Sequence, residues 1–251
     1  MLVPNNTKRT LFFALCFSIP VALVLFLFLF FFMRTNVSSV TLPVAGVPTT
    51  PSTEAPTNPP NSPKVAIVAF GDSITAGYGI TLVDAYPNQL ERALQDKGFS
   101  VKVVNSGVTG ETTAGGLRRA EFVAAQKNDI VILALGGNDV LRGIDPDSTK
   151  KNLAEIIAIF TRAGTRVLLV GMYAPRNLGV AYVSKFNAIY PSLAEEFRVP
   201  LAPFLLEDVV FVPALNQDDG IHPNKAGARI VAEENILPYL LPLVKEVDAS
   251  R

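Results

Sequence analysis

The chain has 251 residues, 49% of them hydrophobic, and its 22 basic residues balance its 22 acidic ones. That length allows one domain with a sizeable core, and the balanced charge gives no electrostatic basis for binding nucleic acid. One histidine and one cysteine exclude an intrachain disulfide and leave few side chains for a catalytic metal site.

The N-terminal region combines a short tail, residues 1–10, with an apolar segment, residues 11–33, that carries no charge. About 23 helical residues at 1.5 Å each cross a hydrocarbon core of roughly 30 Å, so we expect a transmembrane signal anchor there. Lys8 and Arg9 before the segment, against Arg34 after it, favour a cytoplasmic N-terminus. A cleaved signal peptide is the competing interpretation, but the apolar run is long for one.

Residues 34–63 are rich in Pro, Thr and Ser and poor in charge. Such a composition cannot bury enough apolar surface to offset its ordering entropy, and its prolines favour an extended chain. We expect a linker that holds the following domain off the membrane, on the extracytoplasmic side. If the apolar segment is cleaved, the domain is secreted.

From residue 64 to residue 251, short β-branched runs alternate with amphipathic segments. The pattern predicts strands at 65–70, 101–104, 129–135, 166–170 and 199–204, and helices near 86–97, 114–126, 148–163, 182–198 and 225–240. Most of the strands are apolar nearly throughout, which indicates burial on both faces of a parallel sheet. This order predicts a three-layer α/β domain with a five-stranded parallel sheet.

The polar motifs of this domain follow predicted strands. Ser73 comes after the first strand, Gly110 after the second and Asn138 after the third, while Asp219 and His222 end a longer loop after the fifth. Ligands of parallel sheets bind beyond the carboxyl ends of the strands, so these residues are expected at one edge.

Each of these residues suits a role in acyl transfer. Ser73, at a strand-to-helix turn, is the candidate nucleophile, and His222, the sole histidine, is the candidate base. Asp219, three residues earlier in a Gly-containing turn, can orient the imidazole, while the Asn138 amide and the Gly110 N–H can donate to an oxyanion. Taken singly, they can also be a helix N-cap, ordinary turns and a surface histidine. Their joint occurrence favours the catalytic interpretation.

The same motifs resemble a known family. Gly71-Asp72-Ser73, Gly110, Gly136-Gly137-Asn138-Asp139 and Asp219-Gly220-Ile221-His222-Pro223 are similar to the four sequence blocks of the SGNH, or GDSL, hydrolases. The likeness extends over about residues 65–240, and the longer strings around each block resemble the bacterial arylesterase branch around the multifunctional thioesterase I/lysophospholipase.

The resemblance implies a flavodoxin-like α/β/α fold and a triad of Ser73 as nucleophile, His222 as general base and Asp219 as its orienting partner. It also implies an oxyanion hole formed by the N–H groups of Ser73 and Gly110 and the side chain of Asn138. No cofactor and no metal are expected. Asp72 and Asp139 are interpreted as structural residues that fix their loops.

We therefore expect a serine esterase, tethered to a bacterial cell membrane, that hydrolyses carboxylic esters or thioesters of small molecules or lysolipids through an acyl-enzyme. Leu178 and Val180 are expected to line an acyl-binding groove. Two alternatives stay open, an O-deacetylase of a cell-envelope or exported polysaccharide and a non-catalytic surface binding module. The sequence makes no prediction of the natural substrate or the oligomeric state.

Overall fold

The structure is a computed structural model that describes residues 63–251, so the predicted transmembrane anchor and nearly all of the predicted linker lie outside the described residues. A five-stranded parallel sheet runs through the domain in the order β2-β1-β3-β4-β5. Its strands are β1 (Val65–Gly71), β2 (Val101–Gly107), β3 (Ile130–Ala134), β4 (Arg166–Val170) and β5 (Leu201–Ala202). The predicted five-stranded parallel sheet is confirmed.

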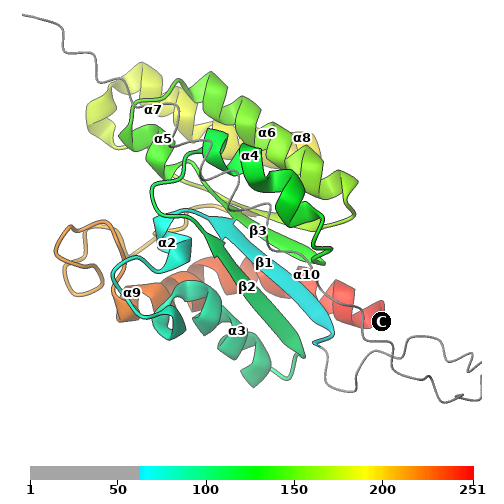
Figure 1. Ribbon diagram of the computed structural model, residues 1–251. Coiled ribbons are helices and arrows are strands. Elements are labelled where there is room, and N and C mark those ends of the chain that lie inside the picture. The colour runs from blue at the N-terminus through cyan, green and yellow to red at the C-terminus, as the bar shows by residue number, and fades with distance from the viewer. Residues whose placement is uncertain (1–62) are drawn as a thin grey trace, which may run out of the picture. The chain divides into compact units, whose positions relative to one another are not determined.

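Helices cover both faces of the sheet and give three layers (Figure 1). One face carries α3 (Tyr86–Asp96), α9 (Lys225–Ile230) and α10 (Leu237–Ala249), and the other carries α4 (Thr113–Ala124), α6 (Pro146–Arg162), α7 (Val180–Asn187) and α8 (Ile189–Phe197). Successive residues of β1 such as Ile67 and Val68 point to opposite faces, and both are fully buried. Burial on both faces explains why the strands are apolar throughout.

Three predicted elements differ from the observed ones. β5 is two residues long, because Pro200 and Pro203 flank it and proline has no N–H to donate to a neighbouring strand. The predicted helix 182–198 is divided at Ala188 into α7 and α8. The predicted helix 225–240 contains the π-helical segment η3 (Val231–Ile236) just before Pro238, where a helical hydrogen bond cannot form.

Four short elements have no predicted range, because three to five residues are too few to show a helical period, although a helix start was expected at Ser73. They are α2 (Ser73–Ala76), η1 (Leu82–Asp84), α5 (Gly137–Leu141) and η2 (Arg176–Leu178). Two of them, α2 and α5, begin the loops that follow β1 and β3 at the carboxyl edge of the sheet. Across residues 63–251, none of the helices has the length and apolar character needed to cross a membrane.

The end of β2 fixes the position of α2. A Cβ added at Gly107 would lie 2.2 Å from the backbone nitrogen of Ala76, so only glycine allows this close approach. The Asn105 amide, also on β2, donates to the carbonyl of Thr75 at 2.7 Å. Since α2 begins with Ser73, these contacts determine where the serine lies.

Candidate active site

Ser73 is the first residue of α2, directly after β1. The preceding residue, Asp72, caps the helix, because its Oδ1 accepts a hydrogen bond from the N–H of Ile74 at 3.1 Å. Interpreting Ser73 as the N-cap is therefore wrong, and its hydroxyl is available for another partner. Ser73 is buried, with 7% of the residue exposed.

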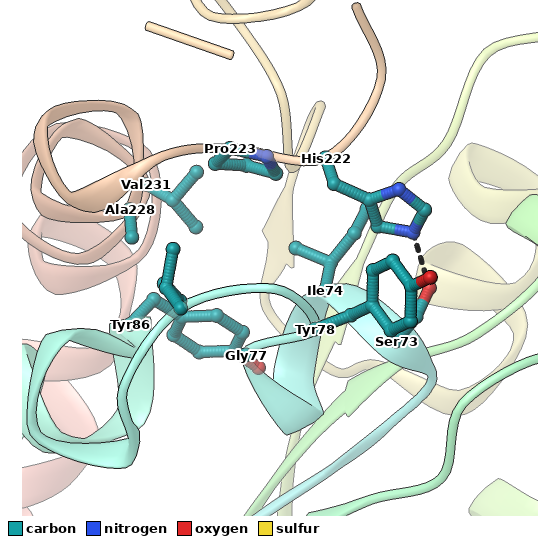
Figure 2. A pocket seen from close by; sticks show the side chains of 10 residues that line it. Ser73, Ile74, Gly77, Tyr78, Tyr86, His222, Pro223, Ala228 and Val231 are labelled. Atoms are coloured by element: carbon teal, nitrogen blue, oxygen red, sulfur yellow. Dashed lines mark hydrogen bonds between the residues drawn. The ribbon is translucent and has the colours of Figure 1, made fainter. Parts of the chain in front are cut away.

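That partner is the single histidine. The Ser73 Oγ lies 2.9 Å from the Nε2 of His222, across 149 residues of chain, and Figure 2 shows the two side chains facing each other. The other ring nitrogen, Nδ1, lies 2.6 Å from the Oδ2 of Asp219. When Nδ1 carries the proton that Asp219 accepts, Nε2 is left to accept the Ser73 hydroxyl proton.

Asp219 is held as an anion by hydrogen bonds. Its Oδ1 accepts from the backbone N–H groups of Ile221 and His222, each at 2.9 Å. The backbone N–H of His222, followed by its imidazole and the N–H of Ile221, lowers the pKa of Asp219 to about 2. The carboxylate is thus ionised at neutral pH and can stabilise a protonated His222. The turn predicted from the Asp-Gly-Ile-His spacing brings these groups together.

Asn138 lies on the other side of Ser73, in α5. Its Nδ2 donates to the Oδ2 of Asp72 at 3.2 Å, which uses one of the two hydrogens of the amide. The turn before it requires Gly136, which has a φ of 117° and at which a Cβ would lie 2.1 Å from the hydroxyl oxygen of Tyr190. The turn aims the amide at the same cavity that Ser73 and His222 line.

Gly110 lines this cavity as well, in the loop after β2. Its carbonyl accepts a hydrogen bond from Arg142 at 2.7 Å. The next residue, Glu111, accepts hydrogen bonds from the Nε of Arg119 at 2.9 Å on both carboxylate oxygens and from its Nη2 on Oε2, and Arg119 also donates to the carbonyl of Gly71 at 3.2 Å. Through this ion pair, the Gly110 loop is tied to the end of β1, next to Ser73.

A second aspartate at the sheet edge is used for loop packing. Asp139 accepts from the backbone N–H of Thr113 at 2.8 Å and from its hydroxyl at 2.5 Å, which joins α5 to the start of α4. Within the described residues 63–251, no three Asp, Glu, His or Cys side chains lie together in an arrangement that could hold a metal ion.

Sequence reasoning missed two residues that support the site. The Gln217 side chain donates to the carbonyl of Tyr78 at 2.7 Å and to that of Pro223 at 3.2 Å, so it joins the loop of Ser73 to the loop of His222. The ring of Tyr78 packs beside the His222 imidazole, with 4.9 Å between centroids (Figure 2). Gly79 lies at this contact, because a Cβ there would lie 1.9 Å from the Oε1 of Gln217. A glycine in the sequence can indicate such a close approach, but it does not identify the residue that approaches.

An apolar cavity of about 610 Å³ opens beside the Ser73 hydroxyl. Much of its wall comes from the segments after β4 and β5, including Met172, Tyr173, Phe204 and Val210. Its size and lining suit an acyl chain better than a sugar, which needs polar partners.

The structure corrects the expected groove residues. Leu178 and Val180 do not line the cavity, whereas Met172 to Arg176, just before them, do. The chain turns away through η2 and through Gly179, which has a φ of 85°, and it then begins α7. Val180 is consequently 87% exposed.

Comparisons with known proteins agree with this geometry. The sequence pattern of the GDSL-like lipase/acylhydrolase family matches residues 69–230. The chain is 38% identical to the esterase TesA of Pseudomonas aeruginosa over 71% of its length and 89% of the relative's. It is 39% identical to the thioesterase 1/protease 1/lysophospholipase L1 of Escherichia coli over 71% of its length and 84% of the relative's. A crystal structure of TesA, 37% identical, superposes with a TM-score of 0.68 and covers 71% of this chain and 99% of that one.

The buried carboxyl of Asp72 predicts a pH-dependent stability. Burial raises the pKa of Asp72 to about 6 from its ordinary 3.8, against the opposing effect of the Ile74 N–H. Because the folded protein holds this proton more tightly, the contribution of Asp72 to stability is full below pH 3.8 and is lost as the pH rises through 6. The free energy of unfolding of the wild type, relative to Asp72→Asn, should fall by about 2 kcal/mol between pH 4 and pH 7. Urea titrations of the domain from Lys64 onward measure this difference, and parallel pH profiles for the two proteins would contradict it.

Proposed function

Since the chain belongs to the GDSL-like lipase/acylhydrolase family and is a hydrolase that acts on ester bonds, we propose that Ser73 is the nucleophile of a serine esterase. The observation that carries the proposal is the chain of hydrogen bonds from Ser73 through His222 to Asp219, at 2.9 and 2.6 Å, at the mouth of an apolar cavity. A nucleophile, a base within hydrogen-bond reach and a third group that orients the base are what acyl transfer through a serine requires.

The reaction begins when the Ser73 Oγ attacks the carbonyl carbon of the ester or thioester and Nε2 of His222 takes the hydroxyl proton. The imidazolium is stabilised by Asp219. The oxyanion receives hydrogen bonds from the N–H groups of Ser73 and Gly110 and from the amide of Asn138. Collapse of the tetrahedral species breaks the bond to the alcohol or thiol, which leaves with the proton from His222.

The second half of the reaction uses the same groups. Water loses a proton to Nε2 of His222 and attacks the acyl carbon bound to Ser73. The bond between the acyl carbon and the Ser73 Oγ then breaks, which releases the carboxylic acid, and His222 gives its proton back to the Oγ. Since Asp219 stays ionised in both halves, it orients and stabilises the imidazole without exchanging a proton.

The cavity favours acyl groups of medium or greater length over acetyl groups. Met172, Phe204 and Val210 present apolar side chains to it, and burying a methylene contributes roughly 0.8 kcal/mol. The Escherichia coli relative is named for thioesterase and lysophospholipase activities, which supports thioesters and lysolipids as substrates of this chain.

We further propose that the enzyme is anchored in a bacterial cell membrane with its catalytic domain on the extracytoplasmic side. The uncharged segment 11–33 and the linker 34–63 support this placement, as do the bacterial sources of the similar proteins. Cleavage of the apolar segment would instead release the domain as a secreted esterase.

Ser73→Ala tests the proposed nucleophile. Without the Oγ no acyl-enzyme forms, so kcat/KM for p-nitrophenyl butyrate should fall by roughly a thousandfold or more. Ser184→Ala, at an exposed serine of α7, is the matched control and should keep its activity. Equal activity of Ser73→Ala and the control would rule out this mechanism.

A pair of valine substitutions tests the proposed acyl site. Val210 lines the cavity and Val180 does not, so tryptophan at position 210 should shorten the space available to the acyl chain. Val210→Trp should lower kcat/KM for p-nitrophenyl decanoate by roughly tenfold or more, and kcat/KM for the butyrate by much less. Val180→Trp should leave the ratio of the two kcat/KM values unchanged. If both variants lost activity on the two esters in equal proportion, the cavity would not be the acyl site.

A further inference from the structure

Large apolar side chains stand exposed around the mouth of the cavity. Leu141, Tyr173 and Phe211 each line the cavity, yet they are 61%, 48% and 73% exposed. They come from three separate segments, α5 and the loops after β4 and β5. We call these three residues the apolar rim. Apolar side chains gathered from distant segments around one opening are typical of an interaction surface.

The backbone at Phe211 is unusual as well. Its φ is 62°, in the left-handed region, which is uncommon for a bulky aromatic residue. Its N–H donates to the carbonyl of Gly220 at 3.2 Å, which holds this conformation. Because 73% of the residue stays exposed, packing in the core does not account for the place of this ring.

We propose that the apolar rim docks on the surface of a lipid bilayer, so that the cavity takes acyl chains directly from the membrane that carries the anchor. This proposal rests on the proposed function and placement above. Phe, Leu and Tyr side chains are those that enter the boundary between headgroups and acyl chains when a protein lies on a membrane.

The length of the linker is compatible with this occupant. Ser73 follows the carboxyl end of β1, whereas Val65 lies at its other end, roughly 23 Å away for seven residues at about 3.3 Å each. A membrane segment joined directly to β1 would hold the apolar rim away from the bilayer. The linker 34–63 can extend to about 100 Å, whereas a domain of this size is roughly 40 Å across. Its length thus allows the domain to turn the rim towards the membrane.

Charges around the rim point to apolar rather than ionic docking. Arg142 and Arg176 are exposed near α5 and η2, while Glu207, Asp208 and Asp218 are exposed in the segment after β5. Since the basic side chains do not outnumber the acidic ones, attraction to an anionic surface is not expected. A zwitterionic phosphatidylcholine bilayer is therefore the appropriate probe.

The chain has no tryptophan, so a single introduced one reports on its own position. We would reconstitute the full chain carrying Phe211→Trp or Leu141→Trp into phosphatidylcholine vesicles that contain brominated lipid, which quenches indole at the bilayer boundary. Phe122→Trp is the matched control, because Phe122 is 74% exposed near the far end of α4, about 13 Å along the helix from its start at the site edge.

Brominated lipid should quench both rim variants roughly threefold more strongly than Phe122→Trp. The proposal would be overturned if the rim and control variants were quenched equally, or if neither rim variant were quenched. It would also be overturned if the protein failed to associate with the vesicles. An unquenched emission shift that disappears on dilution would assign the rim to a second copy and would also overturn it. Hydrolysis of p-nitrophenyl butyrate by the wild-type chain in the same vesicles tests the proposed function separately, because quenching does not depend on catalysis.

Discussion

The carboxyl ends of parallel strands lie at one edge of a sheet, and the whole candidate site depends on that constraint. Ser73, Gly110 and Asn138 follow β1, β2 and β3, so backbone pairing brings these three loops to the same edge. His222 is different, because it ends a long loop after β5. Hydrogen bonds from Gln217 connect that loop to the Ser73 loop, and they take the place of the strand pairing.

Two aspartates within this edge are placed in opposite electrostatic environments. Hydrogen bonds from the His222 loop lower the pKa of Asp219 to about 2, whereas burial raises that of Asp72 to about 6. Asp219 is consequently an anion beside the His222 imidazole, suited to stabilise its protonated form. Asp72 caps α2 and holds the amide of Asn138, so it links the turn of Ser73 to α5. The environment of each carboxyl group, and not its residue type, separates the two roles.

The features that local sequence determines could be predicted. The strands before Ser73 and after Ala163 begin at the predicted residues, and the Asp219–His222 turn forms as its spacing indicates. Features set by distant contacts could not be predicted. The path of the chain after β4 decides that Met172, and not Leu178, lines the cavity, and the role of Gln217 depends on a loop 139 residues away. The shortening of β5 could be predicted only in part. Its flanking prolines are visible in the sequence, but whether they shorten the strand depends on which neighbouring strand they face.

A covalent acyl-enzyme at Ser73 is the species on which the proposed mechanism depends. Rapid acid quenching of the protein during turnover of a p-nitrophenyl ester, followed by mass spectrometry of the peptides, tests it most directly. We expect one added acyl group per chain, on the peptide that contains Ser73, and none on that peptide in Ser73→Ala. An acyl group on another residue, or undiminished hydrolysis by Ser73→Ala, would contradict it.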